Sequence, residues 1–189
     1  PICADGACRG CESSTECAAR DSAAPLCDTG AGACVACLDS ATHCSGTTPI
    51  CDSTKNACRP CTSHTECAAP VGGGICNQTT GACLQQSEIL YVDDDATCPG
   101  DGTFATPYCV LQTAIDNVTT GRTTIHVAAG NYDEVGLQDS GIVWIVGMPG
   151  AEIVASFTPN SAVLVTGTSN LQIEGFTIRS EGGTGAGVE

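Results

Sequence analysis

Cysteine content is the sequence feature that most restricts how this chain can fold. Sixteen of its 189 residues are cysteines, and 14 of the sixteen lie in residues 1–87. That segment contains no Phe, Tyr or Trp and only eight large aliphatic side chains. Burying one such side chain contributes about 1.5–3 kcal/mol, whereas ordering one residue costs about 1–2 kcal/mol. Because eight side chains cannot offset the ordering of 87 residues, covalent cross-links must hold this segment together.

The cysteines of residues 1–87 mark an internal repeat of about three and a half units. The leading cysteines, Cys3, Cys27, Cys51 and Cys76, are 24, 24 and 25 residues apart, and a regular period predicts units stacked along one axis. The units begin PICADGAC, PLCDTGAGAC, PICDSTKNAC and GICNQTTGAC. In each unit, turn-forming residues separate two short segments that carry a cysteine. We therefore interpret each unit as a disulfide-stapled β-hairpin, with the pairing of the cysteines left open.

The C-x-x-C pairs Cys8/Cys11, Cys34/Cys37 and Cys58/Cys61 allow a second reading, because two thiolates at this spacing can share one zinc ion. The segment has only two histidines and four bases to support such sites. Thioredoxin-like redox chemistry is disfavoured as well, since no βαβ pattern surrounds the pairs. A high cysteine density without another core favours disulfides, each worth about 2–3 kcal/mol. We assign all sixteen cysteines to disulfides: Cys3, Cys8, Cys11, Cys17, Cys27, Cys34, Cys37, Cys44, Cys51, Cys58, Cys61, Cys67, Cys76, Cys83, Cys98 and Cys109.

Charge excludes several classes of partner. The chain has 21 acidic and six basic residues, for a formal net charge of −15, so it has no basic surface with which to bind phosphates or anionic lipids. We expect no nucleic-acid partner and no membrane insertion, since the longest apolar stretch, residues 142–155, is shorter than a bilayer requires. The sequence starts at Pro1 without a signal peptide and ends in what reads as the start of another coil, so we expect a piece of a longer protein.

Residues 88–189 follow different rules and form a second domain after residues 1–87. They hold all seven aromatic residues and only two cysteines, and their apolar segments are short and β-branched. Helical spacing occurs once, at Val110, Leu111, Ala114, Ile115 and Val118, with Thr106 as the expected N-cap and Pro107 in the first turn. The sequence therefore predicts an all-β domain with one short helix.

The strands of the second domain recur too closely for helical crossovers. Ile125 and Ile142 are 17 residues apart and Ile142 and Val163 are 21 apart, which suits one turn of a parallel solenoid. Alternation then predicts that Val143 and Leu164 face outward. The side chains predicted to face inward are Ile125, Val127, Ile142, Trp144, Val163, Val165, Ile173 and Ile178.

The first domain resembles the tandem P-x-C-D-x(5)-C-x-x-C repeats of secreted and surface proteins of myxobacteria and related bacteria. In the second domain, YVDDD, GDGTFATPYCVLQTAIDNV, VAAGNYDE, IVGMPGAEI and LQIEGFTIR resemble the N-terminal cap and first coils of the pectin-lyase-like superfamily. The second resemblance implies a right-handed parallel β-helix whose first coil is capped by a helix in residues 108–118. Cys98 and Cys109 lie in the connection into this helix, and we pair them with each other.

The candidate calcium ligands and the candidate acid and base residues lie in the second domain. The cluster Asp93, Asp94, Asp95 and Asp101 could bind Ca²⁺, although these residues also suit a solvated turn. Lone His126 alternates with buried residues and is expected to face outward without a companion. Residues 77–79 and 117–119 are sequons that a eukaryotic secretory route could glycosylate. The side chains that an enzyme of this fold could use are Asp133, Glu134, Asp139, Glu174, Arg179 and Glu181, for which we favour surface roles.

These observations predict a secreted or cell-surface protein that is structural or adhesive. Its stalk and β-helix would contact extracellular glycans or other chains, including copies of itself in a homo-oligomer or filament. The alternative is a secreted polysaccharide lyase or hydrolase whose active site lies beyond residue 189. No catalytic residue is assigned within this chain, and Ca²⁺ is the one candidate cofactor.

Overall fold

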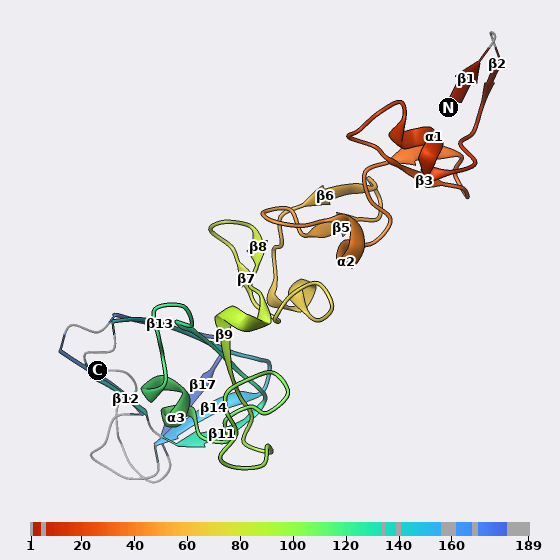
Figure 1. Cartoon of the computed structure of the whole chain (residues 1–189). Coiled ribbons are helices and arrows are strands. Elements are labelled where there is room, and N and C mark those ends of the chain that lie inside the picture. Colours follow the sequence, from red (N-terminus) through yellow and green to blue (C-terminus); the bar gives the residue numbers. More distant parts are fainter. Residues whose placement is uncertain are drawn as a thin grey trace. The chain divides into compact units, whose positions relative to one another are not determined.

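The computed structural model describes residues 2–4, 7–133, 135–138, 141–155, 162–167 and 170–180. The chain divides into two compact units, Pro1–Leu84 and Gln85–Glu189, where the sequence suggested a boundary after residue 87. Most elements in both units are short strands, so the architecture is all-β and rich in disulfides (Figure 1). None of the helices in the described part of the chain has the length and apolar character needed to cross a membrane.

Unit 1 contains four short antiparallel hairpins that follow one another along the sequence (Figure 1). Short helical turns connect them: α1 (Ser14–Ala18), α2 (Ser40–His43) and the 3₁₀ turn η1 (His64–Cys67). The hairpins are β1 (Ile2–Ala4) with β2 (Ala7–Arg9), β3 (Leu26–Asp28) with β4 (Ala33–Val35), β5 (Ile50–Asp52) with β6 (Ala57–Arg59), and β7 (Cys76–Asn77) with β8 (Ala82–Cys83).

The turns of the last three hairpins share one chemistry. In the third hairpin, Asp52 Oδ1 accepts hydrogen bonds from the backbone N–H groups of Thr54 and Lys55, at 2.9 and 3.3 Å. Asp28 and Asn77 make the equivalent bonds in the second and fourth hairpins. Each turn then passes through a left-handed residue, namely Gly32, Asn56 or Gly81, with φ of 63°, 48° and 77°. These residue types tolerate that conformation, which explains why the turns contain them.

The described residues of unit 2 form parallel strands in three sheets (Figure 1). Every pair of neighbouring strands within these sheets is parallel and in register. The four-stranded sheet contains β9 (Ile89–Val92), β10 (Thr124–Val127), β13 (Ile142–Gly147) and β16 (Asn170–Glu174). The second sheet contains β11 (Gly130–Asp133), β14 (Ala151–Ala155) and β17 (Thr177–Ser180), and the third contains β12 (Val135–Gln138) and β15 (Val163–Thr166).

Rows of stacked aliphatic side chains form the core of unit 2. In the four-stranded sheet, Leu90, Ile125 and Ile145 are successive Cα partners and are at most 2 % exposed. Ile173 continues this row on β16 but is only partly buried. Burial therefore decreases at the last described strand of the sheet.

The helix of unit 2 packs on this core but is shorter than expected. It is α3 (Leu111–Asp116), preceded by a short 3₁₀ turn η2 (Gln86–Glu88) near the start of the unit. The sequence prediction of an N-cap at Thr106 was wrong: Val110 is the N-cap, and the Thr106 hydroxyl donates to the Asp101 carboxylate instead. Tyr108 lies outside the helix because its backbone N donates to Tyr91 O of β9 at 2.9 Å and its carbonyl accepts from Asp93 N at 2.8 Å.

The outer edge of β9 is covered by the loop that leads to α3. Tyr91 N donates to Gly102 O at 3.0 Å, and the Arg122 guanidinium donates to Ile89 O at 2.6 Å. The disulfide between Cys98 and Cys109, the pair expected from the sequence, closes this loop. A covered edge cannot recruit a further strand, so the fold protects the first row of unit 2.

The predicted inward face was right for part of the core and wrong for β13. Ile125, Val127 and Val163 are 0 % exposed. Ile142, expected inside, is 68 % exposed, whereas Val143, expected outside, is 0 % exposed. Trp144 also lies on the outer face and is only partly buried. Pairing with β10 sets this orientation, because Ile145 is the partner of Ile125.

Candidate functional site

The joints between successive repeats are the candidate functional site of unit 1. In the second, third and fourth hairpins the two cysteines are cross-strand partners, as in Cys51↔Cys58, yet they are not bonded to each other. Both side chains point to the same face of the hairpin, and each bonds to the preceding repeat. The disulfides are Cys11–Cys27 and Cys17–Cys34, Cys37–Cys51 and Cys44–Cys58, and Cys61–Cys76 and Cys67–Cys83. The repeats form hairpins, as the sequence predicted. The pairing that the sequence left open is between repeats: two disulfides hold the second, third and fourth hairpins each to the repeat before it.

A backbone hydrogen bond accompanies each pair of disulfides. Cys61 N donates to the carbonyl of Gly81, the left-handed residue of the next hairpin, at 3.0 Å. Cys11 and Cys37 make the same bond to Gly32 and Asn56, at 3.1 and 3.2 Å. The turn also packs closely on the preceding repeat. A Cβ on Gly81 would lie 2.6 Å from Pro60 Cβ, and one on Gly10 would lie 2.9 Å from Gly32 Cα.

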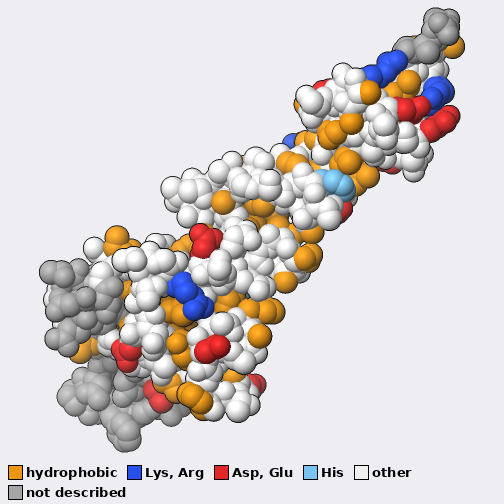
Figure 2. All heavy atoms as spheres, in the orientation of Figure 1, with side chains coloured by type: hydrophobic (Ala, Val, Ile, Leu, Met, Phe, Trp, Pro, Cys, Tyr) orange, Lys and Arg blue, Asp and Glu red, His pale blue; other side chains and the backbone are white. Residues whose placement is uncertain are grey.

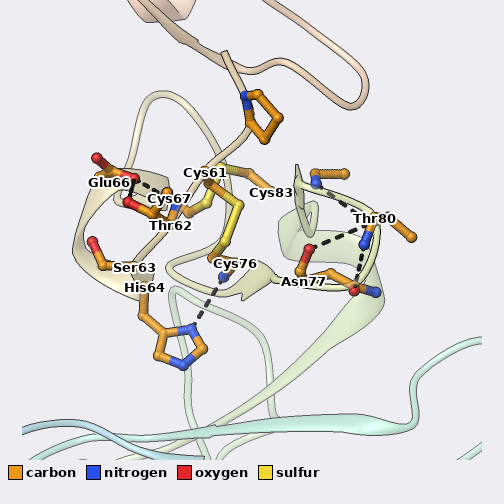
Figure 3. Close-up of a disulfide and its surroundings, with 12 residues drawn as sticks. Cys61, Thr62, Ser63, His64, Glu66, Cys67, Cys76, Asn77, Thr80 and Cys83 are labelled. Carbon is orange, nitrogen blue, oxygen red and sulfur yellow. Dashed lines mark hydrogen bonds between the residues drawn. A yellow bond between two sulfur atoms is a disulfide. The ribbon is translucent and has the colours of Figure 1, made fainter. Parts of the chain in front are cut away.

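A side chain three residues after each C-x-x-C completes the joint. Ser14 and Ser40 accept hydrogen bonds through Oγ from the backbone N–H groups of Cys27 and Cys51, at 3.1 and 2.9 Å. In the third joint His64 takes this place, and Figure 3 shows its Nδ1 accepting from Cys76 N, at 3.1 Å. Figure 3 also shows the disulfides Cys61–Cys76 and Cys67–Cys83 side by side. Each joint therefore combines covalent and polar contacts at equivalent positions.

An ion pair supports the connecting turn of the first and third repeats, and the sequence analysis missed it. Arg59 Nη1 donates to Glu66 Oε2 at 3.3 Å, and Glu66 Oε2 also accepts from Thr62 N at 2.8 Å. The guanidinium of Arg59 lowers the pKa of the Glu66 carboxyl to about 2. Arg9 and Glu16 form the same pair. The signal was present as Arg-x(6)-Glu in the first and third units, while the second unit has Val35 and Thr42 at these positions.

The cysteine clusters do not offer ligands for zinc. The sulfurs of Cys11, Cys17 and Cys34 lie within 4.8 Å of one another, as do two comparable triplets. All of these sulfurs are in disulfides, and none of the described cysteines is a free thiol. Zinc binds the thiolate, so the disulfide-bonded repeats cannot hold it.

The proposed calcium ligands are only partly gathered. Carboxylate oxygens of Asp93, Asp94 and Asp95 lie within 4.8 Å of one another. Asp94 Oδ2 accepts from Asn131 N at 2.9 Å, and its Oδ1 is buried without a hydrogen-bond partner among the described residues. Asp101 is not in this cluster, because hydroxyls of Thr103 and Thr106 donate to it and lower its pKa to about 2. Calcium binding stays a prediction for the first three residues.

The candidate acid and base residues are spread over two sheets. Asp133 is exposed on β11, and Arg179 Nε on β17 bonds to Glu152 Oε2 at 2.7 Å. Glu174 accepts from Trp144 Nε1 at 2.8 Å on the four-stranded sheet. Glu134, Asp139 and Glu181 lie outside the described residues. The structure therefore brings Arg179 to a carboxylate that the sequence analysis had not singled out.

His126 and the two sequon asparagines, Asn77 and Asn117, each have a contact partner in the structure. The His126 ring on β10 lies 5.3 Å from the ring of Tyr91, between centroids, and is half-buried. Asn77 holds the turn of the fourth hairpin, and Asn117 Nδ2 donates to Thr113 O at 2.8 Å.

Comparisons with known proteins bear mainly on the repeats. Residues 1–89 match the model of a family of unknown function, DUF8331. This match covers unit 1 and ends at the first residue of β9. The comparison with curated proteins and the comparison with solved structures each found no match.

Proposed function

We propose that the chain is a structural or adhesive protein of the cell surface or the extracellular space, in which unit 1 is a spacer. The joints between repeats carry this proposal. Each joint is closed by two disulfides and a backbone hydrogen bond, so unit 1 owes its order to bonds that form and persist in oxidising compartments. Such an array can span distance without a hydrophobic core.

Unit 2 is proposed to be the capped start of a right-handed parallel β-helix of the pectin-lyase-like kind. Two features support this fold. Each strand from β10 to β14 pairs in parallel with the strand three elements later, as β10 does with β13 and β11 with β14. In addition, α3 buries Leu111, Ala114 and Ile115 against the core, as the resemblance to that superfamily implies.

The partners are proposed to be extracellular glycans or other chains, including further copies of this one. A hollow of about 480 Å³ lies at the last described row of unit 2, lined by Val165, Leu171, Ile173, Phe176 and Ile178 with Glu174 and Gly175. These side chains are only partly buried, and strand edges can accept another chain through backbone hydrogen bonds. On the face drawn in Figure 2, charged side chains are scattered among neutral ones.

Binding experiments with matched variants of β16 test this proposal. Ile173→Lys places a charge at the hollow, whereas Gln172→Lys places the same charge on the exposed face of the same strand. Self-association, measured by sedimentation, and glycan binding, measured on arrays, are expected to weaken in the first variant only. A chain that binds neither itself nor any glycan or surface protein would contradict the adhesive role.

A secreted polysaccharide lyase or hydrolase is the second candidate, and one observation favours it. Asn131, Glu152 and Thr177 form one row across β11, β14 and β17, and Asp133, Val154 and Arg179 form a second row on the same face of the sheet, in which Val154 is buried. This sheet therefore carries carboxylates and an arginine on one face. We expect no unsaturated or reducing-end products from acidic polysaccharides, with or without Ca²⁺. Product formation that is lost on Arg179→Gln would favour the enzyme.

A further inference from the structure

The disulfides of each joint are interleaved in sequence. In the first joint the order along the chain is Cys11, Cys17, Cys27, Cys34, and the bonds join the first to the third and the second to the fourth. The other two joints have the same order. Interleaving gives two covalent routes from one repeat to the next. Each joint therefore stays closed by a disulfide when either one of its two bonds is cleaved.

The shortest covalent route through the repeats is much shorter than the chain. It follows the chain from Cys11 to Cys17, crosses to Cys34, follows the chain to Cys44 and crosses to Cys58. It then follows the chain to Cys67 and crosses to Cys83. This route contains about 25 peptide units and three disulfides, whereas the chain from Cys11 to Cys83 contains about 72 peptide units.

These routes set a maximum length. A fully extended chain spans about 3.5 Å per residue, and the disulfides of the route join Cα atoms that are 5.3–5.6 Å apart. The oxidised segment can therefore reach about 105 Å, and the reduced segment about 250 Å. Even if force removes all secondary structure, the oxidised repeats cannot exceed the smaller length.

Burial protects the bonds that set this limit. Every one of the six joint disulfides contains at least one cysteine that is no more than 9 % exposed. Cys98, in the unit 2 loop, is exposed. In thiol–disulfide exchange, a thiolate must reach one sulfur, form a mixed disulfide and expel the other sulfur as a thiolate. A second thiol then resolves the mixed disulfide, leaving two cysteine thiols and the oxidised reductant. The joints are therefore the slower bonds to reduce.

We propose that residues 11–83 form a load-bearing tether whose maximum length is fixed covalently, with two parallel bonds at each joint. The tether lengthens appreciably only when a thiol reductant has cleaved both disulfides of a joint. The load-bearing role rests on the proposed spacer function, whereas the length limit rests on the disulfide pairing alone.

Single-molecule pulling on the full chain tests the length limit. An azide-bearing amino acid replaces the exposed residues Glu12 and Gln86, so that DNA handles are attached without using cysteine. At high force, a thiol reductant should lengthen the segment by about 150 Å. An oxidised chain that already reaches the reduced length would overturn the proposal.

Two variants test the parallel routes. One bond of the first joint is removed by Cys17→Ser with Cys34→Ser. Between the handles at Glu12 and Gln86, the remaining route through Cys11 and Cys27 is longer by about three peptide units, so the maximum length should increase by only about 10 Å. Removing Cys11 and Cys27 as well opens the joint and should add about 55 Å to the original limit. A gain of several tens of ångströms from the single-bond variant would overturn the proposal. Misfolding of a variant would not change its maximum length, because this limit is covalent. Peptide mapping checks which disulfides remain. Pulling needs no ligand, so it can succeed where the binding experiments fail.

Discussion

Two isoleucines on the same strand should respond very differently to the same truncation. Ile145 and Ile142 both lie on β13, three residues apart. Ile145 is 0 % exposed and stacks between Ile125 and Ile173, whereas Ile142 is 68 % exposed and is the partner of Asn170. Replacing each by Ala removes the same atoms, so the comparison isolates the effect of burial.

The magnitudes follow from burial. Truncating a buried Ile to Ala costs about 2–5 kcal/mol, because transfer energy is lost and a cavity forms. A surface substitution usually changes the free energy of unfolding by less than about 0.5 kcal/mol. The two variants should therefore differ by at least about 1.5 kcal/mol, more than a tenfold difference in the unfolding equilibrium constant.

Urea unfolding followed by tryptophan fluorescence measures this difference. The chain has one Trp, Trp144, which lies on β13 and donates to Glu174, so its emission reports on unit 2. The midpoint should fall clearly for Ile145→Ala and stay close to the unaltered chain for Ile142→Ala, at an unchanged slope. Equal losses, or a larger loss for Ile142→Ala, would refute the orientation of β13 and the stacking of its core.

Two further predictions concern unit 1. Gly81→Ala and Gly46→Ala both force a side chain into a left-handed backbone, but only Gly81 also faces Pro60, while nothing lies within 4 Å of a Cβ at Gly46. Amide hydrogen exchange at Cys61, which donates to Gly81 O, should accelerate in the first variant alone, and equal acceleration in both would argue against the close contact at the joint. NMR titration of Glu66 should give a pKa of about 2, below its ordinary value of 4.5, because Arg59 holds it charged. Since the folded-state pKa is lowered, the stability that this pair contributes is present above pH 4.5 and is lost as the pH falls towards 2. Arg59→Ala should move the pKa towards 4.5, and a value near 4.5 in the unaltered chain would show that the ion pair does not form.

Periodicity in the sequence predicted the elements but not their connections. The spacing of Cys27, Cys51 and Cys76 marked the hairpins, and Asp52 and Asn77 marked their turns. The sequence does not show which cysteines pair, because the same cysteines at the same positions could bond either within a hairpin or between hairpins. Only the hydrogen bonds and close packing at the joints decide between them.

The orientation of β13 escaped prediction for a different reason. Ile142–Val146 is an unbroken apolar run, so alternation gives no preference for either face. The neighbouring strand decides the orientation of β13, because pairing with β10 places Ile145 in the row of Ile125. Val163 and Leu164 on β15 were assigned correctly: Val163 is 0 % and Leu164 is 48 % exposed.

The sequence predicted which types of residue could form the candidate sites, but not the contacts that these residues make. Asp101 stood near the acidic triplet in sequence, yet Thr103 and Thr106 engage it in its own turn. Arg179 was noted, but its partner Glu152 was not, because the parallel register that brings β14 and β17 together is not visible in the sequence.

The pairing of cysteines between repeats is the central claim, and disulfide mapping tests it most directly. The unreduced chain is digested under acidic conditions that prevent exchange, and cross-linked peptides are identified by mass spectrometry. Because the chain from Cys51 to Cys58 contains Lys55, cleavage there separates the two cysteines of the third hairpin. Cys44 and Cys51 stay on one peptide, so fragmentation of the linked peptides is used to identify which of them is bonded to Cys58. The structure predicts peptides that join Cys37 to Cys51 and Cys44 to Cys58. Peptides that join Cys51 to Cys58 would contradict it, because this disulfide would lie within one hairpin and the joint would have no disulfides.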